Sequence, residues 1–243
     1  MSWDTKEWWV SPFNYHEEVR AGLSLPSRVA LHDATLRDGE QTPGVVFRKE
    51  EKVAIARMLD EVGVDRIEAG MPAVSREDAE AIKEISSLGL RARVMVFSRA
   101  MPEDIDRAIE CGVSGAVVEV PSGVPRLKYQ YTKWSEKDII ERSVRAVSYA
   151  KDKGLFVNFF PFDTTRAELS FLKRLVGEVV ERAKPDSVCV VDTTGSTLPR
   201  AMAFLVGELR REVDVPLEVH THNDLGLGVA SSLAAVEAGA EVV

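Results

Sequence analysis

From residue 29 onward, short runs rich in β-branched residues alternate regularly with longer amphipathic runs. In the first amphipathic run, Val53, Ala56 and Leu59 recur at helical spacing, and glycines such as Gly63 and Gly89 stand where helices should stop. Strand–helix alternation at this rhythm predicts parallel βα units. The expected strands are Val29–Thr35, Val64–Ala69, Ala92–Phe97, Gly115–Val120, Phe156–Pro161, Ser187–Asp192 and Leu217–Thr221. The expected helices are 48–62, 75–88, 102–111, 135–153, 168–183, 197–212 and 226–238.

Seven such units can be counted, and Ala240–Val243 has the pattern of the start of an eighth strand. Because eight units close a barrel of about 250 residues, we predict an α/β fold, a TIM (β/α)8 barrel over residues 29–243 that stops before closure. We expect a fragment boundary, a truncated product or one half of a split enzyme. A doubly wound open sheet is the competing fold, but it requires a Gly-rich turn after the first strand. The sequence has the charged cluster Arg37–Gln41 there instead.

Residues 1–28 differ from the rest of the chain. They hold three of the four tryptophans, together with Phe13 and Tyr15, and show no clear period. So many aromatic residues argue against a disordered end. We expect an arm that packs its aromatic side chains on the barrel or on a neighbouring subunit.

The composition restricts the partners and the compartment. The net charge of −8 disfavours nucleic acid or an anionic membrane as a partner, and no apolar run is long enough to span a bilayer. The first residues lack the apolar core of a signal peptide. With only Cys111 and Cys189, the chain has too few thiols for a cysteine zinc site and suits a reducing cytoplasm.

Two of the four histidines, His220 and His222, stand at the end of the seventh expected strand. Alternation along a strand places them on one face, with backbones roughly 6–7 Å apart. Two imidazoles at the carboxyl end of a barrel strand can bind a metal ion, although a purely structural pair is the alternative.

A hard anionic ligand would complete such a site, and Asp38, just past the first strand, is the best candidate. The first and eighth strands become neighbours when a barrel closes. Arg37 could stabilise an oxyanion beside the metal, or form a simple loop ion pair with Asp38. Glu68, at the end of the second strand, could handle protons or brace Arg37, or be a solvated carboxylate at the rim.

Polar residues also follow other strands. Ser122 and Arg126 come after the fourth strand, Asp163–Arg166 after the fifth and Asp192–Gly195 after the sixth. Hydroxyls and an arginine at these positions could bind a substrate carboxylate. Each signal is weak alone, and their shared location at one face of the barrel is the stronger argument.

Two segments resemble the signatures of a known superfamily: His32-Asp-Ala-Thr-Leu-Arg-Asp-Gly-Glu-Gln-Thr-Pro-Gly44 and His220-Thr-His-Asn-Asp-Leu-Gly226. They are similar to those of the 2-isopropylmalate synthase, homocitrate synthase and hydroxymethylglutaryl-CoA lyase superfamily. The likeness spans residues 29–243. It implies a TIM barrel, a divalent metal such as Mg²⁺, Mn²⁺ or Zn²⁺, and acetyl-CoA as co-substrate. It also implies Claisen-type condensation of the acyl-CoA with a 2-oxo acid, followed by thioester hydrolysis.

By this resemblance, Asp38, His220 and His222 match metal ligands and Arg37 matches a catalytic arginine. The remaining matches are Gln41 and Glu68, at active-site positions, and Thr193, at a position that contacts the oxo acid. Ser122 and Arg126 resemble the segment where homocitrate synthases place an arginine for a distal carboxylate; a surface arginine is the alternative. A 2-oxo acid can chelate a metal through its carboxylate and ketone oxygens.

The segments Glu40-Gln41 and His222–Gly226 resemble the synthases more than the lyases. Ile67–Ala73 is similar to nitrogenase-associated homocitrate synthases. A carbon–carbon lyase or aldolase on the same metal site is the enzymatic alternative. An inactive partial-barrel subunit is the non-enzymatic one. A homodimer, or a complementing chain that supplies the missing unit, is the expected assembly.

The sequence departs from the family pattern in the oxo-acid pocket. Phe162 stands where the synthases usually have Glu, and Ser231 stands where Asn usually follows Ala. The His common after the fourth strand in isopropylmalate synthases is not evident in Ser122–Tyr129. The family's last motif, a Gly-rich stretch with an Asn ligand, and the C-terminal helical region of the synthases would lie beyond Val243.

Overall fold

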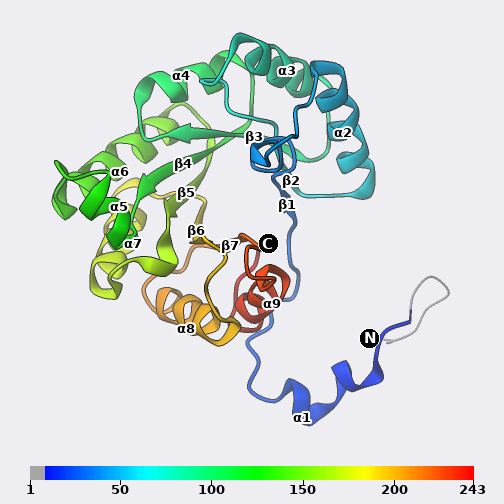
Figure 1. Cartoon of the computed structure of the whole chain (residues 1–243), viewed down its shortest axis with the longest axis vertical. Coiled ribbons are helices and arrows are strands. Elements are labelled where there is room, and N and C mark those ends of the chain that lie inside the picture. Colours follow the sequence, from blue (N-terminus) through cyan, green and yellow to red (C-terminus); the bar gives the residue numbers. More distant parts are fainter. Residues whose placement is uncertain (1–8) are drawn as a thin grey trace.

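The computed structural model describes residues 9–243. Its parallel strands follow one another in chain order round one curled sheet, and helices cover the outer side (Figure 1). The strands are β1 (His32–Asp33), β2 (Arg66–Glu68), β3 (Arg93–Arg99), β4 (Gly115–Pro121), β5 (Phe156–Phe162), β6 (Ser187–Asp192) and β7 (Leu217–Thr221). The helices are α1 (Glu17–Arg20), α2 (Lys49–Val62), α3 (Arg76–Ser87), α4 (Pro102–Glu110), α5 (Val124–Tyr129), α6 (Glu136–Asp152), α7 (Leu169–Ala183), α8 (Pro199–Arg210) and α9 (Gly228–Glu237). The 3-10 turns are η1 (Pro12–Tyr15), η2 (Gly39–Gln41) and η3 (Thr164–Arg166).

Residues 241–243 lie between β7 and β1, in the place of an eighth strand. The Val219 N–H donates to the Val242 carbonyl over 3.0 Å, and the His32 N–H donates to the Val243 carbonyl over 2.8 Å. The Val243 N–H in turn donates to the Ala30 carbonyl. The two ends of the sheet are therefore joined at the amino-terminal side of the barrel. Residues 241–243 make only isolated bridges and form no strand, so the described sheet has seven strands and the predicted incomplete TIM barrel is confirmed.

The predicted elements are all present, with changes at their ends. The predictions for β6 and β7 match the structure, and β3, β4 and β5 extend one or two residues further than predicted. Strand β1 is shorter than Val29–Thr35, because the Leu31 carbonyl accepts hydrogen bonds from both Asp65 and Arg66 and so interrupts the regular ladder. The short helix α5 was not predicted, since six residues are too few for a helical period.

The core has two parts. A large apolar cluster fills the space between the sheet and the helices. A second cluster lies inside the barrel and consists of Met95, Phe97, Val117, Phe160, Cys189 and Val191. The interior beside β1, β2 and β7 is polar instead, because the side chains of His32, Glu218 and Arg66 lie there and are only 3%, 6% and 12% exposed. The barrel interior is therefore apolar on one side and charged on the side that meets the chain's two signature motifs.

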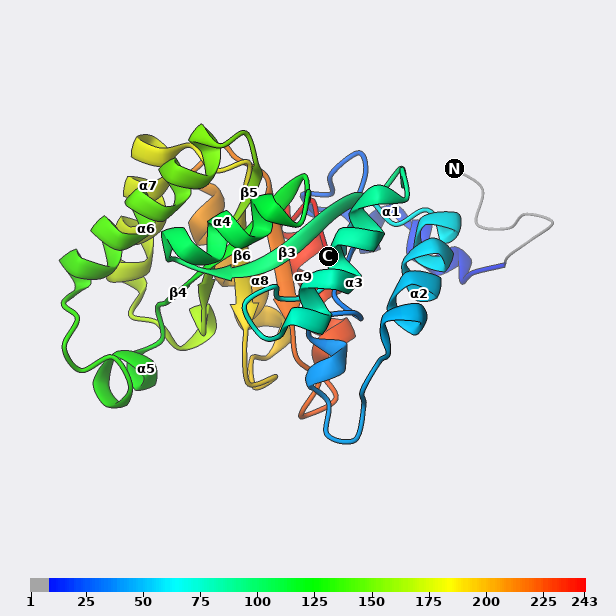
Figure 2. The same cartoon turned by 90° about the horizontal axis from the view of Figure 1, so that it is seen from above.

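The described part of the predicted arm, residues 9–28, projects from the barrel in both views (Figure 1, Figure 2). The exposed fractions of Trp9 and Phe13 are 76% and 72%. The segment is tied to the barrel near its end, where the Ser24 N–H donates to the Glu237 carbonyl. Residues 1–8 of the predicted arm lie outside the described residues. Within residues 9–243, no helix is long and apolar enough to cross a membrane.

Candidate metal centre and active site

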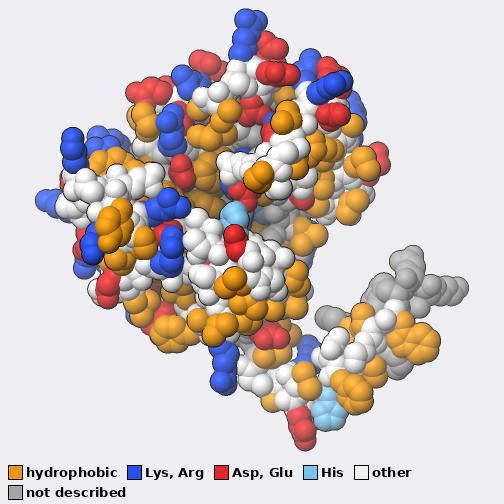
Figure 3. All heavy atoms as spheres, in the orientation of Figure 1, with side chains coloured by type: hydrophobic (Ala, Val, Ile, Leu, Met, Phe, Trp, Pro, Cys, Tyr) orange, Lys and Arg blue, Asp and Glu red, His pale blue; other side chains and the backbone are white. Residues whose placement is uncertain are grey.

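Asp38, His220 and His222 meet at the carboxyl-terminal rim of the barrel. Asp38 lies just after β1, directly before η2, while His220 and His222 come from the end of β7. The Nε2 atoms of both histidines lie 3.4 Å from Oδ2 of Asp38. All three side chains are partly buried, and Figure 3 shows histidine and acidic side chains near the centre of this face.

The donor set fits a divalent cation. One ligand atom from each residue lies within 4.8 Å of the others, and metal–ligand bonds of roughly 2.0–2.2 Å produce separations of this size. Two imidazole nitrogens and one carboxylate leave coordination positions for a substrate. Burial opposes ionisation of Asp38, but hydrogen bonding to His220 and the charges of Arg37 and the histidines hold its pKa at about 2. The carboxylate is therefore in its ligand form at neutral pH.

Arg37 is fixed beside this cluster by two carboxylates and an aromatic ring. Its Nε donates to Glu68 over 2.5 Å, and its NH1 group donates to Asp38 over 3.0 Å. The guanidinium carbon lies 4.2 Å from the centre of the Phe97 ring. Both Arg37 and Glu68 are buried. A buried arginine with fixed partners is a preorganised donor for negative charge that develops beside the metal.

Glu119 is a candidate that the sequence reasoning missed. It lies on β4 in register with Arg99 of β3 and Phe160 of β5. Within residues 9–243 its carboxylate makes no hydrogen bond or ion pair. Burial raises the pKa of Glu119 to about 7, although Arg37, Arg99 and Arg126 lower it. The sequence feature that could have identified Glu119 is its position as the single carboxylate in the otherwise apolar run Gly115–Pro121.

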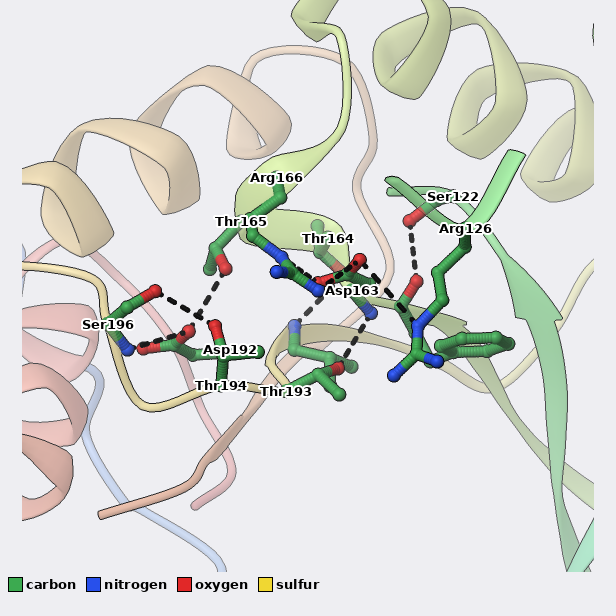
Figure 4. A network of polar contacts seen from close by, with 12 residues as sticks. Ser122, Arg126, Asp163, Thr164, Thr165, Arg166, Asp192, Thr193, Thr194 and Ser196 are labelled. Atoms are coloured by element: carbon green, nitrogen blue, oxygen red, sulfur yellow. Dashed lines mark hydrogen bonds and ion pairs between the residues drawn. The ribbon is translucent and has the colours of Figure 1, made fainter. Parts of the chain in front are cut away.

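The predicted residues after β5 and β6 form a polar network around Asp163 (Figure 4). Both oxygens of the Asp163 carboxylate accept hydrogen bonds from Arg166, over 2.6 and 2.9 Å. The Asp163 N–H donates to the hydroxyl of Thr193 over 2.8 Å. Asp163 has a left-handed φ of 64°, a strained conformation for a residue other than glycine. This network holds the loops at the rim, and it engages both Arg166 and Thr193.

Ser122 and Arg126 lie on the other side of Asp163. The Ser122 hydroxyl is fully buried and donates to the carbonyls of Pro161 and Phe162. The Arg126 guanidinium lies 5.5 Å from the centre of the Phe162 ring. Its Nε is buried and has no hydrogen-bond acceptor within residues 9–243, and Nε lies 3.9 Å from Asp163. Of the two residues, Arg126 therefore retains donor capacity.

The two departures from the family pattern have different surroundings. The ring of Phe162 packs against Arg126 and Tyr131, which makes this part of the rim apolar. The Ser231 hydroxyl donates to the Thr197 carbonyl over 3.0 Å, and so joins α9 to the loop before α8. Phe162 therefore places an aromatic ring at the rim of the barrel. Ser231 instead connects two segments of the fold through its hydrogen bond.

A cavity of about 380 Å³ opens beside Arg37, between the loop after β1, α2 and α3. Gln41, Val46, Phe47 and Met71 contribute to its lining. Lys52 also lines it, held by ion pairs to Glu40 and Asp78. Cavities of this size accommodate part of an organic ligand. Gln41 itself is exposed and lines this cavity.

The sequence profile of the HMGL-like family matches residues 28–243. The chain is 48% identical over 221 residues to 2-isopropylmalate synthase of Methanocaldococcus jannaschii, covering 91% of this chain and 42% of that protein. It is 43% identical over 229 residues to homocitrate synthase AksA of Methanopyrus kandleri, covering 94% of this chain and 57% of that protein. The chain thus spans about half the length of the curated relatives that it matches.

Among solved structures, HMG-CoA lyase of Bacillus subtilis superposes with a TM-score of 0.78 at 18% identity, covering 90% of this chain and 76% of that one. This likeness confirms the barrel fold. The profile covers nearly the whole described chain, and the synthases match it over the same region. The chain belongs to the HMGL-like family.

Proposed function

We propose that this chain is the catalytic barrel of a divalent-metal-dependent acyltransferase. It condenses acetyl-CoA, or another acyl-CoA, with a 2-oxo acid. The observation that supports this most directly is the arrangement of Asp38, His220 and His222 beside the buried Arg37. The identity of 48% to a relative named as a 2-isopropylmalate synthase favours a synthase over a lyase.

Arg37 has the position required to stabilise the negatively charged oxygen that forms from the ketone during carbon–carbon bond formation. A divalent ion held by the three ligands would supply Lewis-acid polarisation of the ketone and orient the oxo acid. When a carbon nucleophile attacks the ketone carbon, the electron pair of the C=O bond moves to oxygen. Arg37, held by Glu68 and Asp38, then meets this new negative charge without having to reorganise.

Glu119 is the best candidate for the base that generates the nucleophile. The carbon next to the thioester must lose a proton, and the electron pair of that C–H bond forms the new carbon–carbon bond. Within residues 9–243, Glu119 is a carboxylate near Arg37 without an ion-pair partner of its own. A pKa of about 7 suits a base that works near neutral pH. Water then cleaves the thioester and releases the CoA thiol.

Two separate parts of the barrel rim are candidates for binding the acyl-CoA and the 2-oxo acid. The cavity beside Arg37 has an apolar lining from Val46, Phe47 and Met71, with Arg48 and Lys49 also lining it. We assign it to the acyl-CoA, because cations there can meet phosphate groups. Arg126, whose side chain is 36% exposed beside Asp163, is our candidate for binding a distal carboxylate of the oxo acid.

The test is a free-thiol assay on the chain with Mg²⁺, Mn²⁺ or Zn²⁺, acetyl-CoA and a panel of 2-oxo acids. We expect thiol release that requires both the metal and one of the oxo acids, and that stops when the metal is chelated. The His16→Gln variant is the matched control, because His16 is an exposed histidine on the arm, away from the site.

The other outcomes identify the alternatives. Release of pyruvate from a 4-hydroxy-2-oxo acid, without thiol release from any oxo acid, would show a lyase or aldolase. A folded chain that neither turns over nor binds metal would contradict an enzymatic role for this barrel.

A further inference from the structure

His32 lies inside the barrel beneath the proposed catalytic groups. It belongs to β1, and its side chain is 3% exposed. Its ring lies between a carboxylate of β7, Glu218, and a carboxylate of β2, Glu68. Neither His32 nor Glu218 has a role in the proposed reaction, although His32 opens the first signature motif.

The two ring nitrogens of His32 face different carboxylates. Nδ1 lies 2.5 Å from Oε1 of Glu218, and Nε2 lies 3.7 Å from Oε1 of Glu68. The Nε2 atom has no hydrogen-bond partner within residues 9–243. The second Glu218 oxygen accepts from Arg66 over 2.7 Å. Glu218 therefore lies between His32 and Arg66. Glu68 lies between His32 and Arg37.

These contacts form a row of alternating charges through the barrel. It runs from Arg66 through Glu218, His32 and Glu68 to Arg37, which contacts the proposed metal ligand Asp38. A neutral imidazole has one N–H donor, whereas an imidazolium has two. Only the imidazolium can hydrogen-bond to Glu218 through Nδ1 and also present a charged N–H to Glu68, at the ion-pair distance of 3.7 Å.

The groups around His32 favour the charged ring. Burial alone would lower the pKa of His32, but the charges of Glu218 and Glu68 outweigh both burial and the repulsion from Arg66, and the net effect raises the pKa. Cys189, from β6, also faces Glu218 and Glu68, and burial raises its pKa well above the ordinary value, so the thiol stays neutral.

The Glu68 carboxylate lies close to two cationic side chains, Arg37 and His32. Its Oε1 atom lies 3.3 Å from the NH2 group of Arg37 and 3.7 Å from Nε2 of His32. A buried carboxylate without a compensating cation is strongly destabilised. When the substrate oxygen also draws on the positive charge of Arg37, a second cation behind Glu68 keeps that carboxylate charged and in place.

We propose that His32 is a positioning residue which, as an imidazolium between Glu218 and Glu68, holds the Glu68 carboxylate against the Arg37 guanidinium. The proposal deepens the proposed function, and its catalytic part rests on that function. Its structural part, the charge state of His32, does not.

The first test is the histidine side-chain NMR spectrum of the whole chain, which has only four histidines to assign. We expect His32 to remain doubly protonated well above the ordinary histidine pKa of about 6.5. In Glu68→Gln the ring should lose its proton at a lower pH than in the wild type. A singly protonated His32 at neutral pH, or a titration that does not respond to Glu68→Gln, would overturn the proposal.

The second test is kinetic and uses His32→Gln, with His16→Gln as the control. Second-sphere partners of metal sites typically contribute about 10–100-fold, so we expect kcat to fall by that factor with KM and Mn²⁺ affinity unchanged. Glu68→Gln and the double variant should have the same kcat, because His32 acts through Glu68. Equal kcat in His32→Gln and the wild type, or independent losses in the double variant, would contradict the positioning role.

The two tests separate two failures. If the chain releases no thiol but the NMR titration of His32 responds to Glu68→Gln, the proposed function fails and the charged His32 stands. If His32→Gln unfolds the chain, the NMR titration of the wild type and of Glu68→Gln still decides the charge state.

Discussion

Replacing His222 with Gln is expected to lower kcat/KM for thiol release by roughly three orders of magnitude, equivalent to about 4 kcal/mol of transition-state stabilisation. His222 contributes one of the two imidazole nitrogens next to Asp38 that we propose as metal ligands. An amide is a poor substitute for imidazole at a transition-metal site. The side chain of His222 is 37% exposed, so the substitution should not disturb the core. The measurement is the initial rate against metal concentration.

The dependence on metal distinguishes a lost ligand from a damaged fold. His222→Gln should retain the thermal unfolding midpoint of the metal-free wild type but lose the stabilisation that added metal confers. The arm variant His16→Gln should behave like the wild type in both assays. Wild-type activity and metal-dependent stabilisation in His222→Gln would show that this residue is not a ligand.

Replacing Glu119 with Gln is expected to lower kcat by roughly 10²–10⁴-fold, the usual contribution of a general base. The amide cannot accept a proton from the carbon next to the thioester. Glu119→Asp keeps a carboxylate on β4 and should retain part of the rate. If the ionised form of Glu119 is the base, kcat/KM of the wild type should rise as pH increases through its pKa of about 7.

The pH profile and isotope exchange test the role of Glu119 separately from substrate binding. In Glu119→Gln the rise of kcat/KM near pH 7 should be absent, and deuterium from solvent should no longer enter the acetyl methyl group. Glu136→Gln, at an exposed acid on α6, is the control. An unchanged rate of deuterium incorporation in Glu119→Gln would assign the base to another residue.

The fold could be predicted because each βα unit carries its own local signal. The runs Ser187–Asp192 and Leu217–Thr221 are bounded by turn residues, and the structure has strands with those bounds. The strand β1 was predicted too long, because its hydrogen bonding to β2 is interrupted at Leu31. The local sequence does not show that the Leu31 carbonyl accepts two hydrogen bonds. Tertiary pairing, rather than propensity, decided that boundary.

The candidate site was predictable where side chains follow strands. Asp38, His220 and His222 are polar residues at strand ends, and the barrel brings strand ends together. Glu119 and His32 lie within strands and point inward, so their meaning depends on neighbours from other strands. Sequence periodicity identifies a strand's faces but not the partners across the barrel. The polar interior beside β1, β2 and β7 therefore required the structure.

In the proposed mechanism, the cluster of Asp38, His220 and His222 holds a metal to which the 2-oxo acid binds directly. Mn²⁺ bound to the chain can be followed by electron paramagnetic resonance while a 2-oxo acid is added, with the carboxylic acid that lacks the keto group as control. We expect one bound Mn²⁺ per chain and a spectrum that changes with the 2-oxo acid and not with the control acid. A spectrum that is unaffected by the 2-oxo acid, or Mn²⁺ binding that persists when Asp38, His220 and His222 are all replaced, would contradict it.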